Sequence, residues 1–245
     1  MALRGEKFST RDVDLIVETK GEAEELTDVL TKLGFVVNTR PKNECQRMVD
    51  ARVLAKGDGP RIDLFVVSVC GKLVLSEGMR SRSQLHSVLG RLSLRLCARE
   101  DIFFLKSVTE REKDLEDRFV LYQVGIDKEI VLRECELKSL DDASGKGRIY
   151  EAFLLAKLEE MEDRFDISLP WMERLRRIAE RKLETKLVLE RLARGGATVA
   201  KLSTDLGLPR SQVRAVLKQL EISNSIVIDR TRRPFVISAR DRACS

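Results

Sequence analysis

Three aspartates could bind metal ions if two predicted strands bring them together. Asp12 and Asp14 stand at the start of the apolar run 13–17, and Asp63 lies inside a second apolar run, 61–67. Side chains at positions i and i+2 of a strand point to the same face, so Asp12 and Asp14 should project together. An ionised Asp63 in that setting is costly unless a cation meets it. Three such carboxylates can hold two Mg²⁺ ions, which bridge a nucleoside triphosphate and activate a hydroxyl for in-line phosphoryl transfer.

An α/β module is predicted to position these carboxylates. Its strands are short apolar runs, and its helix has apolar residues at helical spacing. Because strands separated by a helix are typical of α/β modules, residues 1–98 are assigned to one such domain. The expected strands cover 13–17, 35–37, 47–55, 61–67 and 92–96, and the expected helix covers 26–33.

The apolar period changes to 3.6 residues from about residue 99, which predicts a helical extension over 99–169. The polar segment 141–147 interrupts this extension and is a candidate hinge. A further helix over 170–193 has Pro170 in its first turn, where proline is well tolerated, and it opens a third region, 170–245. The helices expected within the extension lie at 102–106, 115–122, 130–140 and 149–164.

The segment 198–220 closely resembles a helix-turn-helix. Ala200 is the small residue expected where the two helices cross, and Gly207 permits the turn. Ser211 is expected to cap the N-terminus of the second helix. The residues expected on the inner face of that helix are Val213, Val216, Leu217 and Leu220.

Two short apolar runs around 226–228 and 235–237, joined by a basic turn, complete the pattern of a winged helix. The resemblance implies that the second helix enters a groove of double-stranded DNA or RNA and that the basic turn contacts the backbone. Winged helices also serve as dimer or partner modules, so that alternative stays open. The residues expected to contact nucleic acid are Arg210, Gln212, Arg214, Lys218, Arg230, Arg232 and Arg233.

The charge of the chain is distributed unevenly along its length. The net charge is +5, but residues 171–245 hold 17 Lys/Arg against 8 Asp/Glu, a balance of +9, and residues 1–170 hold 28 against 32, a balance of −4. A basic C-terminal region on a mildly acidic body indicates a polyanionic partner for that region, although a solvated helix surface has the same composition.

The N-terminal half resembles the polymerase-β-like nucleotidyltransferases. The sequence TRDVDLIV at 10–17 is similar to their D-h-D strand, and IDLF at 62–65 is similar to the strand that carries their third carboxylate. The segments DIFFLK at 101–106 and EKDLED at 112–117 are similar to the helices that follow the core in toxin-like members, so the resemblance spans about 2–125. It implies that Asp12 and Asp14 bind both Mg²⁺ ions, that Asp63 binds the catalytic one, and that nucleotide or substrate contacts come from Lys106, Lys113 and Asp117.

One family feature is missing from the chain. The family's first strand ends in a glycine turn whose backbone amides hold the triphosphate, whereas only Met1 precedes the segment 2–5, which resembles the following helix. We therefore expect this chain to be a poor nucleotidyltransferase. A sheet edge lacking its neighbour also invites pairing, so we expect either a homodimer or a true start upstream.

The remaining composition narrows the chemistry and the compartment. His86 is the only histidine and has no nucleophile motif around it, so carboxylates and bases must carry any chemistry. No apolar stretch approaches the roughly 20 residues that a membrane span needs, and no secretory signal is visible. The odd number of cysteines, without a C-x-x-C pair, argues against a disulfide framework or a thiolate zinc site and favours a cytoplasmic protein. They are Cys45, Cys70, Cys97, Cys135 and Cys244.

The leading functional hypothesis is Mg²⁺-dependent transfer of a nucleoside monophosphate from a nucleoside triphosphate to a hydroxyl of a protein or RNA. The winged helix would then target nucleic acid or regulate the protein's own expression. The alternative is a non-catalytic DNA-binding transcriptional regulator, or an antitoxin-like protein, on a degenerate nucleotidyltransferase fold. A third hypothesis is that both halves are interaction modules.

Overall fold

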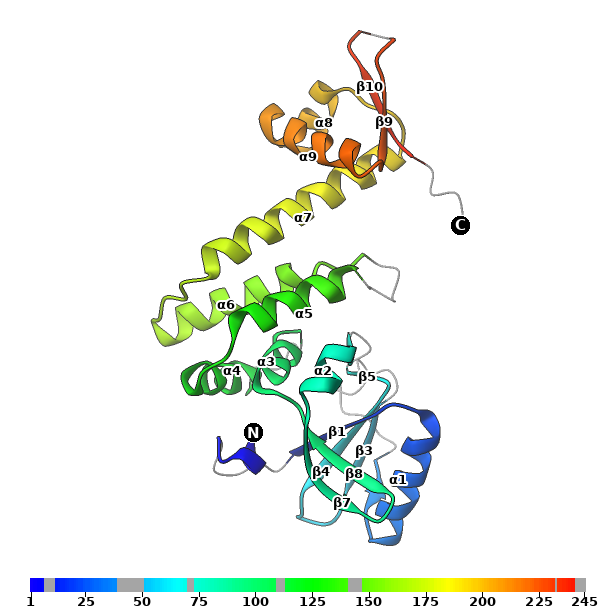
Figure 1. Cartoon of the computed structure of the whole chain (residues 1–245), viewed down its shortest axis with the longest axis vertical. Helices are drawn as coiled ribbons and strands as arrows, with labels where there is room; N and C mark the ends of the chain where they lie inside the picture. Colours follow the sequence, from blue (N-terminus) through cyan, green and yellow to red (C-terminus); the bar gives the residue numbers. More distant parts are fainter. Residues whose placement is uncertain are drawn as a thin grey trace. The chain divides into compact units, whose positions relative to one another are not determined.

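The computed structural model describes residues 1–6, 12–38, 51–69, 73–108, 113–140, 147–231 and 233–240. The chain divides into two compact units, Met1–Leu169 and Pro170–Ser245. Both units combine helices with small sheets, so the protein belongs to the mixed α/β class (Figure 1). None of the helices in these described ranges is both long and apolar enough to cross a membrane.

A four-stranded sheet forms the first part of the N-terminal unit. Its strand order is β1-β4-β3-β2, with β1 parallel to β4 and the other two pairs antiparallel. All four predicted strands in this region are present, although residues 47–50 of the third lie outside the described residues. The strands are β1 (Asp12–Val17), β2 (Val36–Val37), β3 (Ala51–Ala55) and β4 (Arg61–Val66).

One face of this sheet is covered by α1 (Lys20–Lys32). The helix begins at a capping box, in which the Thr19 side chain accepts from the Glu22 backbone and the Glu22 side chain accepts from the Thr19 backbone. Leu15 and Val17 of β1 and the even-numbered residues of β4 pack against this helix, as period-2 alternation requires. Leu64 is fully buried in this cluster. The opposite face therefore receives the aspartates.

Smaller hairpins and a short helix follow the sheet. The predicted strand at 92–96 is present, and it pairs with a strand that the sequence analysis missed. That missed strand has a bulge between Leu85 and Ser87, and Leu85 and Val88 are both exposed, so its residues do not alternate cleanly. The elements are β5 (Ser68–Val69), β6 (Leu73–Val74), α2 (Glu77–Arg82), β7 (Gln84–Leu89) and β8 (Leu92–Leu96).

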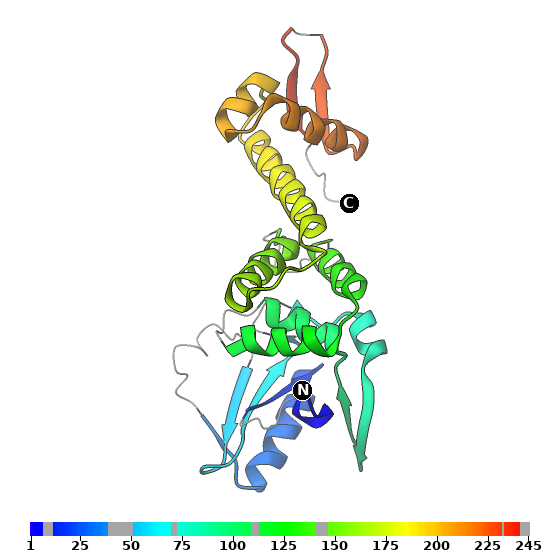
Figure 2. The same ribbon diagram turned by 90° about the vertical axis from the view of Figure 1, so that its left-hand side faces the viewer.

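Four helices complete the N-terminal unit and lie beyond one end of the strands (Figures 1 and 2). All four correspond to helices that the apolar period predicts. Phe119 stacks on Phe165 with ring centroids 3.9 Å apart, which joins the second of these helices to the fourth. The candidate hinge is outside the described residues except for Gly147. The helices are α3 (Arg99–Ser107), α4 (Lys113–Val124), α5 (Lys128–Leu140) and α6 (Tyr150–Phe165).

The second unit contains a long helix, two shorter helices and an antiparallel hairpin. The four residues expected on the inner face of the second short helix are all buried, at 0–4% exposure. They pack with residues of the long helix and both strands in one core cluster. The elements are α7 (Met172–Ala193), α8 (Val199–Leu206), α9 (Arg210–Ile222), β9 (Ile226–Asp229) and β10 (Val236–Ala239).

Two local predictions for this unit are wrong. Ser211 does not cap α9, because the Pro209 carbonyl accepts from the Val213 amide and the helix already begins at Arg210. Ala200 does not lie at a helix crossing, because its position on α8 is exposed. Gly207 does supply the turn, with φ +66°, a left-handed conformation that favours glycine.

Candidate functional site

The three aspartates lie on the sheet face opposite α1. Asp14 is the register partner of Asp63 across the parallel β1–β4 pair, and Asp12 is the register partner of Arg61. The predicted arrangement, with two aspartates on one strand and the third on its neighbour, is confirmed. Strand alternation directs all three side chains to one face.

Arg61 supplies the cation that Asp63 requires. The side chain of Asp63 is buried, and its Oδ1 and Oδ2 accept from the Nε and Nη2 of Arg61 at 2.7 and 3.0 Å. The two residues are two positions apart on one strand, so they share a face. Sequence reasoning named the need for a partner but missed Arg61, although the i, i−2 spacing was a signal that could have found it.

One of the three acids is bonded to a cation of its own strand. Both Asp63 oxygens are bonded to Arg61, so Asp63 would have to release that guanidinium before it could bind a metal. In the described ranges, no group of three His, Cys, Asp or Glu side chains is placed to hold a metal ion.

A buried lysine on α3 is held by two acids on α4. Lys106 Nζ lies 2.8 Å from Asp114 Oδ1 and 2.7 Å from Asp117 Oδ2. Burial alone would lower the pKa of Lys106, but the two carboxylates raise it above its ordinary value. The structure thus brings together the predicted residues Lys106 and Asp117 and adds Asp114. The predicted residue Lys113 has a side chain outside the described parts.

Arg118, next to this cluster, is itself buried. Its Nη1 donates to the backbone carbonyl of Lys106 at 2.8 Å, and its Nη2 lies 3.7 Å from Glu160 Oε2. Burial lowers the pKa of Arg118, and the carboxylate of Glu160 opposes that change. The lysine, its two acids and this arginine therefore form one charged cluster between α3, α4 and α6.

The charged cluster and the aspartate face lie on the same side of the sheet. Leu105 of α3 packs with Phe65 of β4 and Ile16 of β1. Phe65 and Ile16 each follow an aspartate by two residues, so they share its face. The helix that carries Lys106 therefore packs on the sheet face that carries the aspartates. Each group has charged partners of its own.

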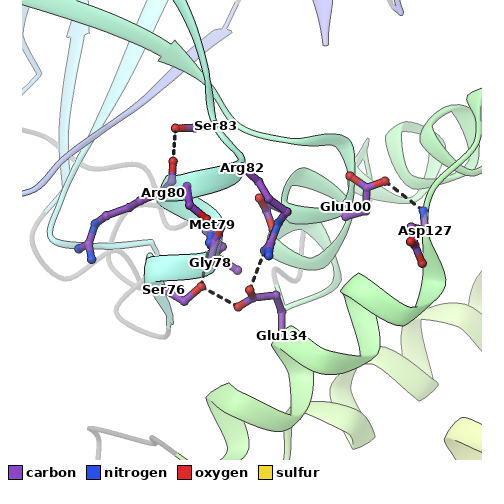
Figure 3. A network of polar contacts seen from close by, with 11 residues as sticks. Ser76, Gly78, Met79, Arg80, Arg82, Ser83, Glu100, Asp127 and Glu134 are labelled. Carbon is purple, nitrogen blue, oxygen red and sulfur yellow. Dashed lines mark hydrogen bonds and ion pairs between the residues drawn. The ribbon is translucent and has the colours of Figure 1, made fainter.

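A second buried network fixes the position of α3 (Figure 3). Arg82 Nη2 donates to Asp101 Oδ1 and to Glu134 Oε1, both at 2.6 Å, and Ser76 Oγ donates to Glu134 Oε2 at 2.7 Å. A Cβ on Gly78 would come within 2.7 Å of Glu134 Oε1, so only glycine fits there without a shift. Burial raises the pKa of Asp101 despite Arg82. This network joins α2, α3 and α5 and was not found from the sequence.

In the second unit, three basic side chains form one row along α9. Arg210, Arg214 and Lys218 follow at i, i+4 and i+8, and all three are exposed. In the part of the chain that the structure describes, none of the three side chains has a hydrogen bond or an ion pair. We call these three residues the basic row. Gln212 lies beside it and is also exposed.

The basic row is unfavourable for the helix by itself. Like charges four residues apart destabilise a helix by roughly 0.2–0.5 kcal/mol per pair. Arg210 also stands in the first turn, where the helix dipole disfavours a cation. An anion placed along the row would relieve both effects.

The arginines of the hairpin have different surroundings. Arg230 Nη2 lies 2.7 Å from Glu221 Oε1, so its guanidinium joins the start of the hairpin turn to the end of α9. Arg233 is exposed. Arg232 lies outside the described residues. Among the predicted contact residues that the structure describes, Arg230 thus already has an acid partner, whereas the basic row has none.

No protein-family model matches this sequence, and no curated protein is similar enough to be counted as a relative.

We expect Arg61→Met to destabilise the protein more than Asp63→Asn does. The first change leaves a fully buried carboxylate without its cation. It should cost about 2–3 kcal/mol, less than for a fully buried pair, because Arg61 is one-third exposed. The second change leaves a guanidinium that can turn to water. Urea unfolding of both variants measures the difference, and equal losses would contradict the assigned pairing.

We expect Lys106→Met to cost about 3–5 kcal/mol, because it removes the ammonium group to which two buried acids are bonded. Lys157→Met is the matched control, since Lys157 also has a carboxylate at 2.8 Å but in a more exposed pair. That control should cost under about 1 kcal/mol. Similar unfolding free energies for the two variants would show that burial does not decide the outcome.

Proposed function

We propose that this protein binds double-stranded nucleic acid through its second unit. The observation that carries the proposal is the basic row of α9, which is exposed and has no acid partner among the described residues. Phosphate groups are the anions that arginine and lysine rows most often meet in such helices. The partner is therefore a duplex, with α9 in a groove.

The order of elements supports this assignment. α8 and α9 are joined by a short turn at Gly207, and an antiparallel hairpin follows directly, as in a winged helix-turn-helix. The core side of α9 is closed by apolar packing, so its opposite side is the one available to a partner. Arg233 places a further cation on the hairpin turn, where it would contact the backbone.

Among the hypotheses that the sequence allows, we favour a DNA-binding regulator on a nucleotidyltransferase-like fold. The acids that would bind Mg²⁺ are engaged differently: Asp63 is held by Arg61. The C-terminal basic row needs no rearrangement before it can bind a polyanion. A DNA-binding regulator requires only that the basic row can bind a polyanion.

We expect Arg214→Ala/Lys218→Ala to weaken binding to a random-sequence DNA duplex by roughly tenfold near physiological salt. Removing two phosphate contacts should also reduce the slope of log affinity against log salt by about 1.8. Fluorescence anisotropy across a salt series measures both quantities. The variant Arg91→Ala/Lys157→Ala removes two charges from the first unit and serves as the control.

The two variants separate a specific surface from a general charge effect. The proposal predicts a loss for the α9 variant alone. Equal losses in both variants would indicate non-specific attraction, and binding that ignores both variants and salt would indicate a protein-interaction module.

Nucleotide transfer is the second candidate function. The observation that favours it is the register pairing of Asp14 with Asp63, on the side of the sheet where Lys106 also lies. Nucleotidyltransferases need acids that lie side by side on neighbouring strands, and their chemistry depends on Mg²⁺ bound by those acids. The residues that would hold it are the three aspartates, after Asp63 has released Arg61.

We expect little transfer of label from a radiolabelled nucleoside triphosphate in the presence of Mg²⁺. The reason is that both Asp63 oxygens are bonded to Arg61, and an oriented triphosphate is also required. Robust transfer that Asp14→Ala abolishes and the turn variant Asp58→Ala leaves unchanged would instead establish the second candidate.

A further inference from the structure

The long helix of the second unit has an exposed apolar face. Leu183 and Leu187 are one turn apart on α7 and are 42% and 44% exposed. Beside Leu187, a groove of about 400 Å³ runs between α7 and α8. Its lining residues are Leu187, Glu190, Arg191, Arg194, Asp205 and Leu206. A protruding leucine and an open groove thus occur on one helix.

We propose that α7 binds α7 of a second copy of this chain in an antiparallel pair, with Leu187 on the twofold axis. This arrangement places Leu183 of each copy against the groove of the other. The surface is then isologous, because the same patch supplies both the side chain that enters and the groove that receives it. The overlapping segments, residues 180–194, are about 21 Å long at 1.5 Å per residue.

Charge complementarity supports a second copy as the occupant. Glu180 and Arg194 lie seven residues before and after Leu187, so the twofold axis places each opposite the other in the partner. Both are exposed, and neither has a side-chain ion pair or hydrogen bond within the residues that the structure describes. The pair therefore forms two intermolecular ion pairs per dimer.

The charges also select this register over the adjacent one. An axis at Thr185 would pair Leu183 with Leu187 and Glu184 with Lys186. It would also create two like-charged pairs, Glu180 with Glu190 and Arg176 with Arg194. Like charges across an interface oppose association. With the axis at Leu187, the remaining like pair is Glu184 with Glu190, and Lys186 Nζ already lies 3.8 Å from Glu190.

Charge reversal tests the pairing directly on the full 245-residue chain. Sedimentation equilibrium over a concentration series, without nucleic acid, measures the dimer dissociation constant. Glu180→Arg and Arg194→Glu should each raise it by at least about tenfold, and the double variant Glu180→Arg/Arg194→Glu should restore it to within about threefold. Leu187→Glu should leave a monomer with an unchanged circular dichroism spectrum.

Arg177→Glu is the matched control. It makes the same charge change on the same helix but lies outside the overlapping segment, so the dissociation constant should not change. A monomeric wild-type chain would overturn the proposal. So would a dimer that ignores the charge reversals, such as one formed through the outer edge of β1, or a double variant that fails to restore association. The outcome is independent of nucleic-acid binding, which the anisotropy experiment measures separately.

Discussion

The first unit depends on a single constraint: each of several buried carboxylates needs a cation. Asp63 is held by Arg61 within one strand, and Lys106 holds two acids of α4. Arg82 forms ion pairs with Asp101 of α3 and with Glu134 of α5. Removing one member of such a set is costly because the others remain buried and charged. The ion pairs of Lys106 and Arg82 therefore join helices of this unit to one another.

The second unit uses its charges in the opposite way. Its core is a single apolar cluster, and the cations of the basic row remain on the surface. Arg230 and Arg191 do have acid partners, Glu221 and Asp205. The partnered arginines stabilise the unit, whereas the cations of the basic row are available to a polyanion. This contrast also explains why net charge alone could not identify the surface.

The aspartate face shows how a family resemblance and local geometry can diverge. Strand order places Asp14 beside Asp63, as the resemblance to nucleotidyltransferases requires. The side chain of Asp63 nevertheless turns to Arg61 on its own strand. Backbone register thus agrees with a metal site, whereas side-chain pairing favours a stable ion pair. If the protein functions by binding nucleic acid, the β1–β4 register matters only because it builds the sheet.

Much of the architecture could be predicted from the sequence, because helices and strands bury residues at periods of 3.6 and 2 along the chain. The inner face of α9 and the pairing of the two aspartate-bearing strands are examples. The strand β7 could not be found, since its exposed Leu85 and Val88 break the alternation. The partners of the buried charges were decided only by the tertiary structure. Arg82 and Glu134 are 52 positions apart, and an ion pair depends on a separation of a few ångströms that no local pattern records.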